Sequence, residues 1–586
     1  MSYNNFIHIL TSNLNLTIPL QKPNSRNRKR IPKNPWITKS LLRSINRKNK
    51  LFYKQKINPS TRNRTQYVRY RNVLTSSLRA STQLYFSRQF EKHKFDMKST
   101  WKVINEALKS KNDTDPPKYI HKNNRKIDDP SDMAEVFNDF FVNIGPNLAN
   151  NIPNTNTDFH KFLNDPNPQS LFFNPIIEEE TKNIIINLNT KKGAGHDGLT
   201  NFLLKNIVDV IISPLTFIFN LSLTTGAVPL NMKIARVVPI FKKGQKESLN
   251  NYRPISLLTS ISKILEKLVY TRTQNFLFNS KILSDSQFGF RKNHSTTHAL
   301  LAFIDKIAHA IDDVSHTIGV FLDFSKAFDT INHDILIEKL RHYGIRGVPL
   351  DWFISYLSNR KQFVSINGHD SHSKIVTCGV PQGSLLGPLL FILYINDLRN
   401  SSPLLSFICF ADDTNLFLTH RDPQTLVDTL NKELVSVQSW IYANKLSLNI
   451  DKTNYMLFSN TIKILLTQVN FNDTELKQVD CTKFLGLYID SDLSWKPHII
   501  YLSRVLSRNT GILNKLKHFF PKRILLSVYS TLITPYLNYG ILAWGNASIN
   551  LINILFRIQK RAIRNVNNVE YLAHTNNLFH ICSTKF

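Results

Sequence analysis

Short apolar runs alternate with segments of helical periodicity through the middle of the chain, from about residue 174 to residue 490. The apolar runs are rich in β-branched and aromatic residues and have the length of strands; they span residues 235–241, 317–322, 406–410 and 456–458. Alternation of this kind is typical of mixed folds rather than of helical bundles. We therefore expect an α+β domain over residues 174–495, with its core at about 223–490.

Helical, basic segments are predicted on both sides of this domain. Before it, apolar side chains such as Leu41 and Ile45 recur at helical spacing, with Arg and Lys on the other faces. After it, a second apolar stripe that includes Leu555 lies opposite a row of basic residues. We expect a basic helical extension and linker over residues 1–115 and a helical C-terminal region over residues 496–586.

The charge balance indicates a polyanionic partner. The 586 residues include 74 Lys and Arg against 42 Asp and Glu, a formal net charge of +32, and the first 100 residues contain only Glu91 and Asp96 as acids. This excess favours nucleic acid over a membrane, because the longest apolar stretches are interrupted or too short to span a bilayer. For residues 1–35, a disordered tail or a nuclear-localisation run is the alternative. The four cysteines include no CxxC pair, which excludes a cysteine zinc module.

Acidic residues follow two of the apolar runs. Asp323 comes directly after residues 317–322, and Asp412 with Asp413 lies in a tight turn after residues 406–410. Neighbouring carboxylates raise each other's pKa, and a bound divalent cation relieves that repulsion. Carboxylate oxygens are the ligands that Mg²⁺ prefers, so these three acids have the composition of a two-metal phosphoryl-transfer site. Taken alone, the Asp-Asp pair also fits an ordinary hairpin turn.

Eight segments place these acids in a recognisable order. They are residues 193–198 (GAGHDG), 251–256 (NYRPIS), 287–291 (QFGFR), 321–329 (FLDFSKAFD), 379–388 (GVPQGSLLGP), 410–413 (FADD), 446–453 (LSLNIDKT) and 483–486 (KFLG). In order and spacing they resemble the reverse transcriptases of non-LTR (LINE-type) retrotransposons, closest to the jockey-like group. Similar flanks at residues 35–39 and 555–563 extend the resemblance over nearly the whole chain.

The resemblance implies roles for residues around the acids. Asp323, Asp412 and Asp413 would be the catalytic residues and would bind two Mg²⁺ ions, with Mn²⁺ as a substitute. The carbonyl of Phe324 would be a further metal ligand. Phe328 would be the steric gate that excludes a ribose 2′-OH, and ordinary core packing is the alternative for this residue.

The resemblance also implies nucleotide-binding residues. Gln382 and Gly383 match the turn beside the incoming nucleotide. Arg253, together with Lys242 or Lys243, matches the residues that grip the triphosphate, where a planar guanidinium suits phosphate oxygens. A generic basic surface is the alternative for these cations.

Other basic residues are expected to contact the leaving group or the nucleic acid. Lys452 matches the general acid for the pyrophosphate leaving group, although a solvated lysine fits its position nearly as well. The residues expected to bind nucleic acid are Arg28, Lys29, Arg30, Arg557, Lys560 and Arg561.

The fold implied is a right-hand polymerase with a ferredoxin-like antiparallel palm sheet, fingers from about residue 174 and a helical thumb in the C-terminal region. The implied function is that of an RNA-directed DNA polymerase, which adds dNTPs to a primer 3′-OH. Its partners would be an RNA template, a DNA primer or target, and dNTPs, with no membrane. We expect a polymerase that lacks the N-terminal endonuclease, which another protein would then supply, and that acts as a ribonucleoprotein in the nucleus, the cytoplasm or both.

Two other functions fit parts of the pattern. One is a catalytically inactive, retroelement-derived RNA-binding remnant. The other is a different two-metal enzyme, such as a nuclease or an RNA-dependent RNA polymerase. The intact acids and Phe328 argue against the first, and substitution of Phe328 discriminates the second from a reverse transcriptase. No motif indicates an oligomeric state.

Overall fold

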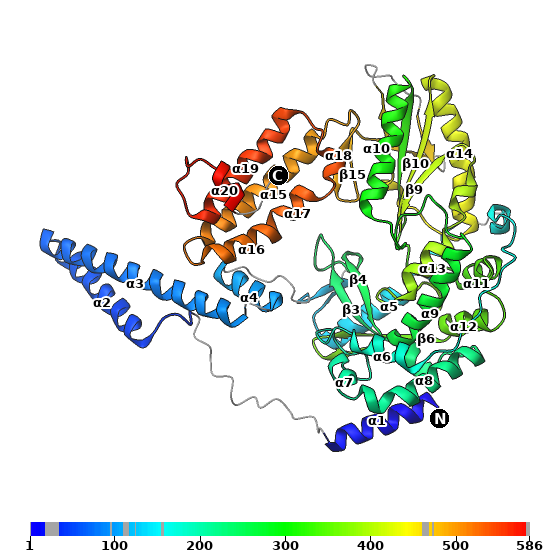
Figure 1. Cartoon of the computed structure of the whole chain (residues 1–586), viewed down its shortest axis with the longest axis horizontal. Coiled ribbons are helices and arrows are strands. Elements are labelled where there is room, and N and C mark those ends of the chain that lie inside the picture. The colour runs from blue at the N-terminus through cyan, green and yellow to red at the C-terminus, as the bar shows by residue number, and fades with distance from the viewer. Residues whose placement is uncertain are drawn as a thin grey trace. The chain divides into compact units, whose positions relative to one another are not determined.

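The computed structural model describes residues 2–17, 34–93, 96–108, 117–122, 125–153, 157–459, 468–471 and 474–581. The chain divides into two compact units (Figure 1). Unit 1 comprises Met1–Pro19, Thr114–Gly486 and Ser491–Leu493, and unit 2 comprises Leu20–Asp113, Leu487–Asp490 and Ser494–Phe586. Unit 1 contains two five-stranded sheets with their helices, whereas unit 2 is almost entirely helical, so the chain as a whole is compatible with the predicted α+β class.

The first sheet of unit 1 has the strand order β14-β11-β5-β10-β9. Its strands are β5 (His316–Asp323), β9 (Ser406–Phe410), β10 (Asp413–His420), β11 (Asn454–Phe458) and β14 (Lys477–Gln478). Neighbouring strands pair antiparallel, except for the parallel pair of β11 and β14. This sheet carries the acids at one end of its central strands.

Both faces of the first sheet are covered, which explains why β5 and β9 are largely apolar runs in the sequence. Ile318 and Val320 of β5 belong to the large core cluster that includes the apolar side of α14 (Pro423–Ala443). On the alternate side of the strand, the ring centroid of Phe321 lies 6.1 Å from that of Phe303 in α10 (Thr296–Asp312). In Figure 1, α10 and α14 accordingly lie on opposite sides of the sheet.

The second sheet of unit 1 joins strands from two distant parts of the chain. Its order is β4-β3-β6-β7, with β8 paired to β6. The strands are β3 (Ile234–Phe241), β4 (Tyr252–Leu257), β6 (Arg360–Ile366), β7 (His369–Asp370) and β8 (Lys374–Val376). β3 pairs antiparallel with β4 and parallel with β6, so residues 360–376 extend a sheet that the earlier strands begin.

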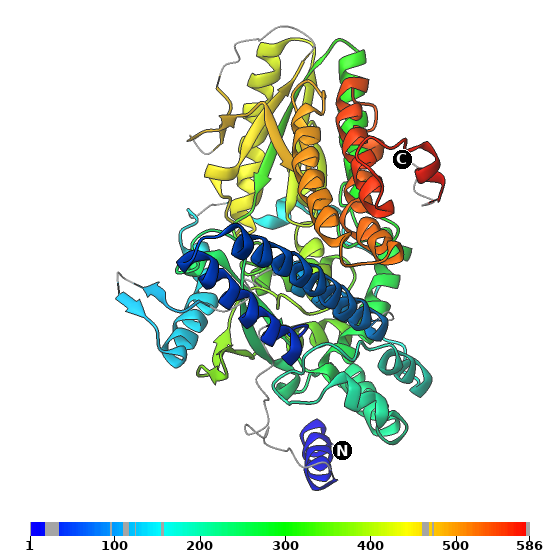
Figure 2. The same ribbon diagram turned by 90° about the vertical axis from the view of Figure 1, so that its left-hand side faces the viewer.

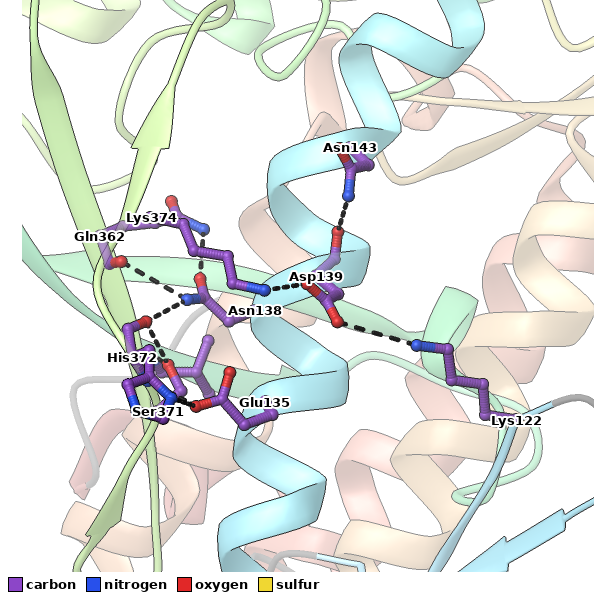
Figure 3. Close-up of polar contacts among 10 residues, drawn as sticks. Lys122, Glu135, Asn138, Asp139, Asn143, Gln362, Ser371, His372 and Lys374 are labelled. Atoms are coloured by element: carbon purple, nitrogen blue, oxygen red, sulfur yellow. Dashed lines mark hydrogen bonds and ion pairs between the residues drawn. The ribbon is translucent and has the colours of Figure 1, made fainter.

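Helix α5 (Pro130–Asn150) packs on the second sheet and brings its segment into unit 1. Figure 3 shows its polar contacts: Asn138 Nδ2 donates to the His372 carbonyl at 2.8 Å, and Glu135 Oε1 accepts from the His372 backbone N–H at 2.6 Å. Asp139 of the same helix forms ion pairs with lysines of the neighbouring strands. The sequence pattern did not place this helix in any predicted domain. Its hydrogen-bond partner His372 lies more than 200 residues further along the chain, where no local pattern can indicate the contact.

The other helices of unit 1 surround the two sheets. They are α1 (Tyr3–Thr17), α6 (Glu178–Ile186), α7 (Asn201–Asn206), α8 (Val208–Thr225), α9 (Ser260–Asn279), α11 (His333–His342), α12 (Val348–Leu357) and α13 (Leu386–Tyr394), with the short strands β1 (Ile120–Lys122), β2 (Arg125–Ile127), β12 (Asn470–Phe471), β13 (Thr474–Glu475) and β15 (Cys481–Phe484). Tyr3 and Phe6 of α1 are buried in the same core cluster as α8. Within the described residues, α8 alone has the length and composition of a membrane-crossing helix, and half of it is buried in the protein, as in a core helix.

Unit 2 combines helices from both ends of the chain. They are α2 (Lys39–Ile57), α3 (Thr61–His93), α4 (Met97–Leu108), α15 (Lys496–Leu516), α16 (Lys522–Leu532), α17 (Thr534–Asn538), α18 (Ile541–Trp544), α19 (Ile549–Asn567) and α20 (Asn576–Ile581), with the short strand β16 (Leu487–Asp490). The rings of Phe86 and Phe90 in α3 lie 5.9 Å and 4.6 Å from that of Phe520. The segments predicted as a separate extension and a separate C-terminal region therefore share one hydrophobic interior.

Helices α2 and α3 form a hairpin within unit 2. They lie side by side in both views (Figures 1 and 2). The ring centroid of Phe52 in α2 lies 5.5 Å from that of Tyr67 in α3, and Arg47 of α2 lies over the ring of Tyr70 at 5.5 Å. The aromatic residues interleaved with the basic ones thus hold the two helices together, which leaves the remaining basic side chains at the surface.

Candidate active site

The pairing of β5 with β10 brings the predicted catalytic acids together. Asp323, the last residue of β5, lies directly opposite Asp413, the first residue of β10. On the other side of β10, Asp413 pairs with Phe410 of β9, which leaves Ala411 and Asp412 as a two-residue loop. A hairpin this tight holds Asp412 beside the two paired acids, at the end of the first sheet.

The negative charge of these acids is only partly compensated by neighbouring lysines. Partial burial, followed by the charges of Asp412 and Asp323, raises the pKa of Asp413 to about 6. Lys452 partly offsets this charge, because its Nζ lies 3.2 Å from Oδ2 of Asp323. Carboxylates in this condition gain stability from a cation placed between them.

The acids fit divalent metal ions in chemistry and charge. Asp323 and Asp413 present hard oxygen donors from adjacent strands. Burial and, after it, repulsion from Asp412 and Asp323 raise the pKa of Asp413, and a cation would offset that repulsion. In the described part of the chain, no group of three or more His, Cys, Asp or Glu side chains is arranged as the ligands of one ion. Phe324 is buried next to Asp323 and forms an isolated bridge to Leu448. The complete metal-ligand set therefore stays a prediction.

The predicted triphosphate-binding cations lie on the second sheet. Arg253 is exposed on β4 opposite Ile240 of β3, and the Lys242 backbone N–H donates to the carbonyl of Asn251 at 2.8 Å. Burial lowers the pKa of Lys242, and the positive charges of Arg253 and Lys452 lower it further. Basic side chains from the two sheet regions are thus close enough to influence each other. Their role as a triphosphate site is untested.

Phe328 lies between the core and the active-site surface. Its ring stacks on Phe391 of α13 with centroids 4.7 Å apart, and it meets Phe290 edge-on at 6.4 Å. The side chain is partly buried against the large core cluster. These contacts show that Phe328 packs against the core, and its function as a steric gate stays a prediction.

Gln382 has a partner that the sequence did not indicate. Its Nε2 donates to both carboxylate oxygens of Asp329, each at 2.9 Å. Burial raises the pKa of Asp329 to about 6, and the hydrogen bond from Gln382 acts against that rise. Asp329 is the last residue of the FLDFSKAFD segment. Its place in that motif is the only sequence signal that could have marked it as a site residue. It holds the Gln382 amide in one orientation.

Gly383 is required by a close approach between backbone segments. Its φ is +126°, and a Cβ at this position would lie 2.6 Å from the carbonyl oxygen of Ser256 in β4. The Ser256 N–H also donates to the carbonyl of Gln382 at 2.8 Å. Only glycine fits this conformation and this distance. The turn predicted to lie beside the nucleotide is therefore anchored to the second sheet.

The predicted nucleic-acid-binding residues fall in two places. Arg28, Lys29 and Arg30 lie outside the described residues. Arg557, Lys560 and Arg561 lie on α19 of unit 2, where Arg557 is exposed and Lys560 Nζ lies 4.3 Å from the ring centroid of Phe556. Leu555 and Ala562 are buried on the other side of the helix, as the apolar stripe predicted.

Comparison with known families identifies the class of this site. Residues 240–489 match the family described as reverse transcriptase (RNA-dependent DNA polymerase). This segment contains the whole first sheet, together with Asp323, Asp412 and Asp413. The segment is therefore a reverse transcriptase domain, a class that generally depends on divalent metal ions.

Relatives that match most of the chain define the group more closely. The probable RNA-directed DNA polymerase from transposon BS of Drosophila melanogaster is 31% identical over 428 residues, which cover 70% of this chain and 46% of that protein. The RNA-directed DNA polymerase from mobile element jockey of the same species is 27% identical over 71% of this chain and 47% of its own length. The probable RNA-directed DNA polymerase from transposon X-element of Drosophila melanogaster is 28% identical over 68% of this chain and 45% of its own length. The resemblance to jockey-like non-LTR retrotransposon reverse transcriptases is thus confirmed, and the chain spans about half the length of these relatives.

Proposed function

We propose that this chain is an RNA-directed DNA polymerase that adds dNTPs to a primer 3′-OH, using an RNA template and releasing pyrophosphate. The observation that carries the proposal is the register of β5 and β10, which sets Asp323 opposite Asp413 inside the reverse transcriptase domain. Both acids belong to apolar strands that are buried on both faces, so their backbone positions are fixed by packing.

The residues of the chain would contribute mainly position and charge to this reaction. Asp323, Asp412, Asp413 and the carbonyl of Phe324 would hold two Mg²⁺ ions, which supply Lewis-acid charge at the reacting phosphate when bound. Arg253 and the lysines near it would bind the triphosphate. Lys452 donates to Asp323, and we propose that it protonates the leaving pyrophosphate.

We propose that unit 1 and part of unit 2 supply the parts of a right-hand polymerase. We assign the first sheet, with α10 and α14, as the palm, and the second sheet with the helices before it as the fingers. The C-terminal helices of unit 2 would be the thumb. RNA and DNA would bind largely through phosphate contacts. We further propose that the protein acts as a ribonucleoprotein in the nucleus, the cytoplasm or both.

Primer extension on poly(rA)/oligo(dT) with Mg²⁺ and dTTP tests the proposed activity directly. We expect processive addition of dTMP by the full chain and none when EDTA replaces Mg²⁺. Folded protein that binds the template–primer but adds no nucleotide would reject the polymerase and favour an RNA-binding remnant. An Asp412→Asn variant controls for contaminating polymerases.

Replacing Phe328 with alanine is expected to raise the ratio of ribonucleotide to deoxynucleotide incorporation by roughly 10- to 100-fold, because the ring that would clash with the 2′-OH is removed. The measurement is kcat/KM for rUTP and dTTP on the same template–primer. Phe328→Tyr keeps the ring and should keep the wild-type ratio. If Phe328→Ala lowers the melting temperature but leaves the ratio unchanged, the residue packs the core and is not a gate.

A basic face of α2 is expected to contribute to nucleic-acid affinity. Arg43, Arg47, Lys50 and Lys54 are exposed and spaced to lie along one side of the helix. Substituting all four with glutamine should weaken RNA–DNA hybrid binding and reduce the slope of log K against log salt by about 0.7–0.9 for each phosphate that is no longer bound. Fluorescence anisotropy at several salt concentrations measures both quantities.

Substitution is preferable to deletion of this segment, because removing residues 1–100 would strip Phe86 and Phe90 from the interior of unit 2. Lys432→Gln, exposed on α14, is the control and should leave the slope unchanged. An unchanged slope in the fourfold variant would show that this face of α2 does not contact nucleic acid.

A further inference from the structure

A segment before α10 lies against the loop that carries Asp412. The Phe288 N–H donates to the Cys409 carbonyl at 2.8 Å, and the Cys409 N–H donates to the Ser286 carbonyl, also at 2.8 Å. These two bonds add residues 286–288 alongside β9 at the edge of the first sheet. Backbone hydrogen bonds alone therefore hold this segment next to the hairpin.

The side chain of Gln287 continues this contact into the loop. Only 4% of the residue is exposed, and its Oε1 accepts from the Gly289 N–H at 2.7 Å and from the Ala411 N–H at 3.0 Å. Ala411 is the first residue of the two-residue loop and has a φ of +56°. Residues other than glycine adopt this left-handed conformation at a cost, so the loop conformation needs support from outside the hairpin.

The surrounding contacts leave Gln287 little freedom. A Cβ on Gly289 would lie 2.3 Å from the Ala411 nitrogen, so glycine is needed for the segment to come this close. The side chain of Arg291 also stabilises the segment, because its Nη1 donates to the carbonyls of Ser284 at 2.6 Å and Gln287 at 3.1 Å. An acceptor oxygen is thereby fixed in front of the Ala411 N–H.

We propose that Gln287 is a positioning residue of the polymerase site: its amide oxygen holds the Ala411 N–H and so fixes the hairpin loop that presents Asp412 and Asp413. This inference rests on the proposed function for its kinetic consequence, whereas the structural consequence can be measured without any activity. Gln287 Oε1 accepts from the backbone of Ala411, so its proposed effect on the acids acts through the loop.

Three variants separate the acceptor oxygen from the rest of the side chain. Gln287→Met keeps the length and removes the amide oxygen. Gln287→Asn keeps the amide but shortens the side chain by one methylene, which moves the oxygen away from the Ala411 N–H. This variant replaces Gln287→Met in the test if the methionine variant fails to fold. Gln287→Glu keeps both length and acceptor. Asn138→Leu, which removes a buried amide that bridges α5 to the second sheet, is the matched control for reduced stability (Figure 3).

Two measurements on the full chain decide between the outcomes. Amide hydrogen exchange of a peptide covering residues 405–415 should accelerate at least tenfold in Gln287→Met and Gln287→Asn, and should stay at the wild-type rate in Gln287→Glu and in Asn138→Leu. In primer extension, Gln287→Met should lower kcat by about 10- to 100-fold, as expected for catalytic groups misplaced by about 1 Å, with KM for template–primer within twofold of wild type.

Wild-type exchange in Gln287→Met, or in Gln287→Asn if the methionine variant does not fold, would overturn the proposal. Accelerated exchange with unchanged kcat would also overturn it, because the loop would then not need this support for catalysis. If wild-type protein adds no nucleotide, the proposed function fails, and the exchange experiment alone still decides whether Gln287 holds the loop.

Discussion

Asp413→Asn is expected to reduce single-turnover primer extension by about 1,000-fold or more, because the substitution would remove a proposed metal ligand, and a bound metal ion supplies several kcal/mol of transition-state charge stabilisation. Asp413 lies opposite Asp323 across β5 and β10, so one substitution removes half of the paired carboxylates. The rate is measured at saturating template–primer, dTTP and Mg²⁺. Asp323→Asn should reduce the rate by a similar factor.

The same substitution should not destabilise the metal-free protein. Burial raises the pKa of Asp413, and the charges of the neighbouring Asp412 and Asp323 raise it further. Removing its charge therefore relieves repulsion, and we expect an unchanged or higher melting temperature near pH 8 in EDTA. Asp428→Asn, exposed on α14, is the matched control and should keep the wild-type rate. Extension by Asp413→Asn within tenfold of wild type would refute the assignment of this acid.

Lys339→Met is expected to lower the free energy of unfolding of unit 1 by about 3–5 kcal/mol, since it leaves a buried carboxylate without its partner. Lys339 on α11 is fully buried, and its Nζ donates to Asp397 Oδ1 and to the Tyr394 carbonyl, each at 2.6 Å. The ring of Trp440 lies 5.2 Å from the same nitrogen. Burial lowers the pKa of this lysine, whereas the charge of Asp397 raises it. Urea denaturation followed by tryptophan fluorescence measures the change.

Two further variants show whether the destabilisation comes from the unpaired charge. Arg341→Met breaks the exposed pair between Arg341 and Glu338 on the same helix and should cost only about 0–1 kcal/mol. The double variant Lys339→Met/Asp397→Leu removes both buried charges and should recover much of the stability that the single variant lacks. A double variant as unstable as Lys339→Met would mean that packing, and not charge, dominates at this site.

The acids that we predict to be catalytic could be singled out in the sequence because local signals mark them. Asp323 follows an apolar run whose length and composition are those of a doubly buried strand, and Asp412 and Asp413 interrupt two such runs at hairpin spacing. Each signal lies within about ten residues of chain. The order of the eight segments then indicated the family. The match of residues 240–489 confirms a reverse transcriptase, and the relatives confirm the non-LTR group.

The partners of the motif residues could not be predicted in this way. Gln382 and Asp329 are 53 residues apart, and Ala411 lies 124 residues from Gln287. Each of these interactions joins one side chain to a distant loop, and no periodicity in either segment encodes it. The burial of Lys339 could not be predicted either, because in the sequence it is an ordinary basic residue near the end of a helix.

The amino-acid sequence by itself determined the mixed class of unit 1, the reverse transcriptase signature and the acids at its centre, since strand-length apolar runs and short motifs act over neighbouring residues. Only the tertiary structure decided the register that sets Asp323 against Asp413, the joining of both ends of the chain in unit 2, and the place of α5 on the second sheet. These features depend on which buried surfaces pack together. The free energy that favours this packing is spread over contacts between residues that are far apart in the sequence, from 90 positions for Asp323 and Asp413 to 234 for Asn138 and His372.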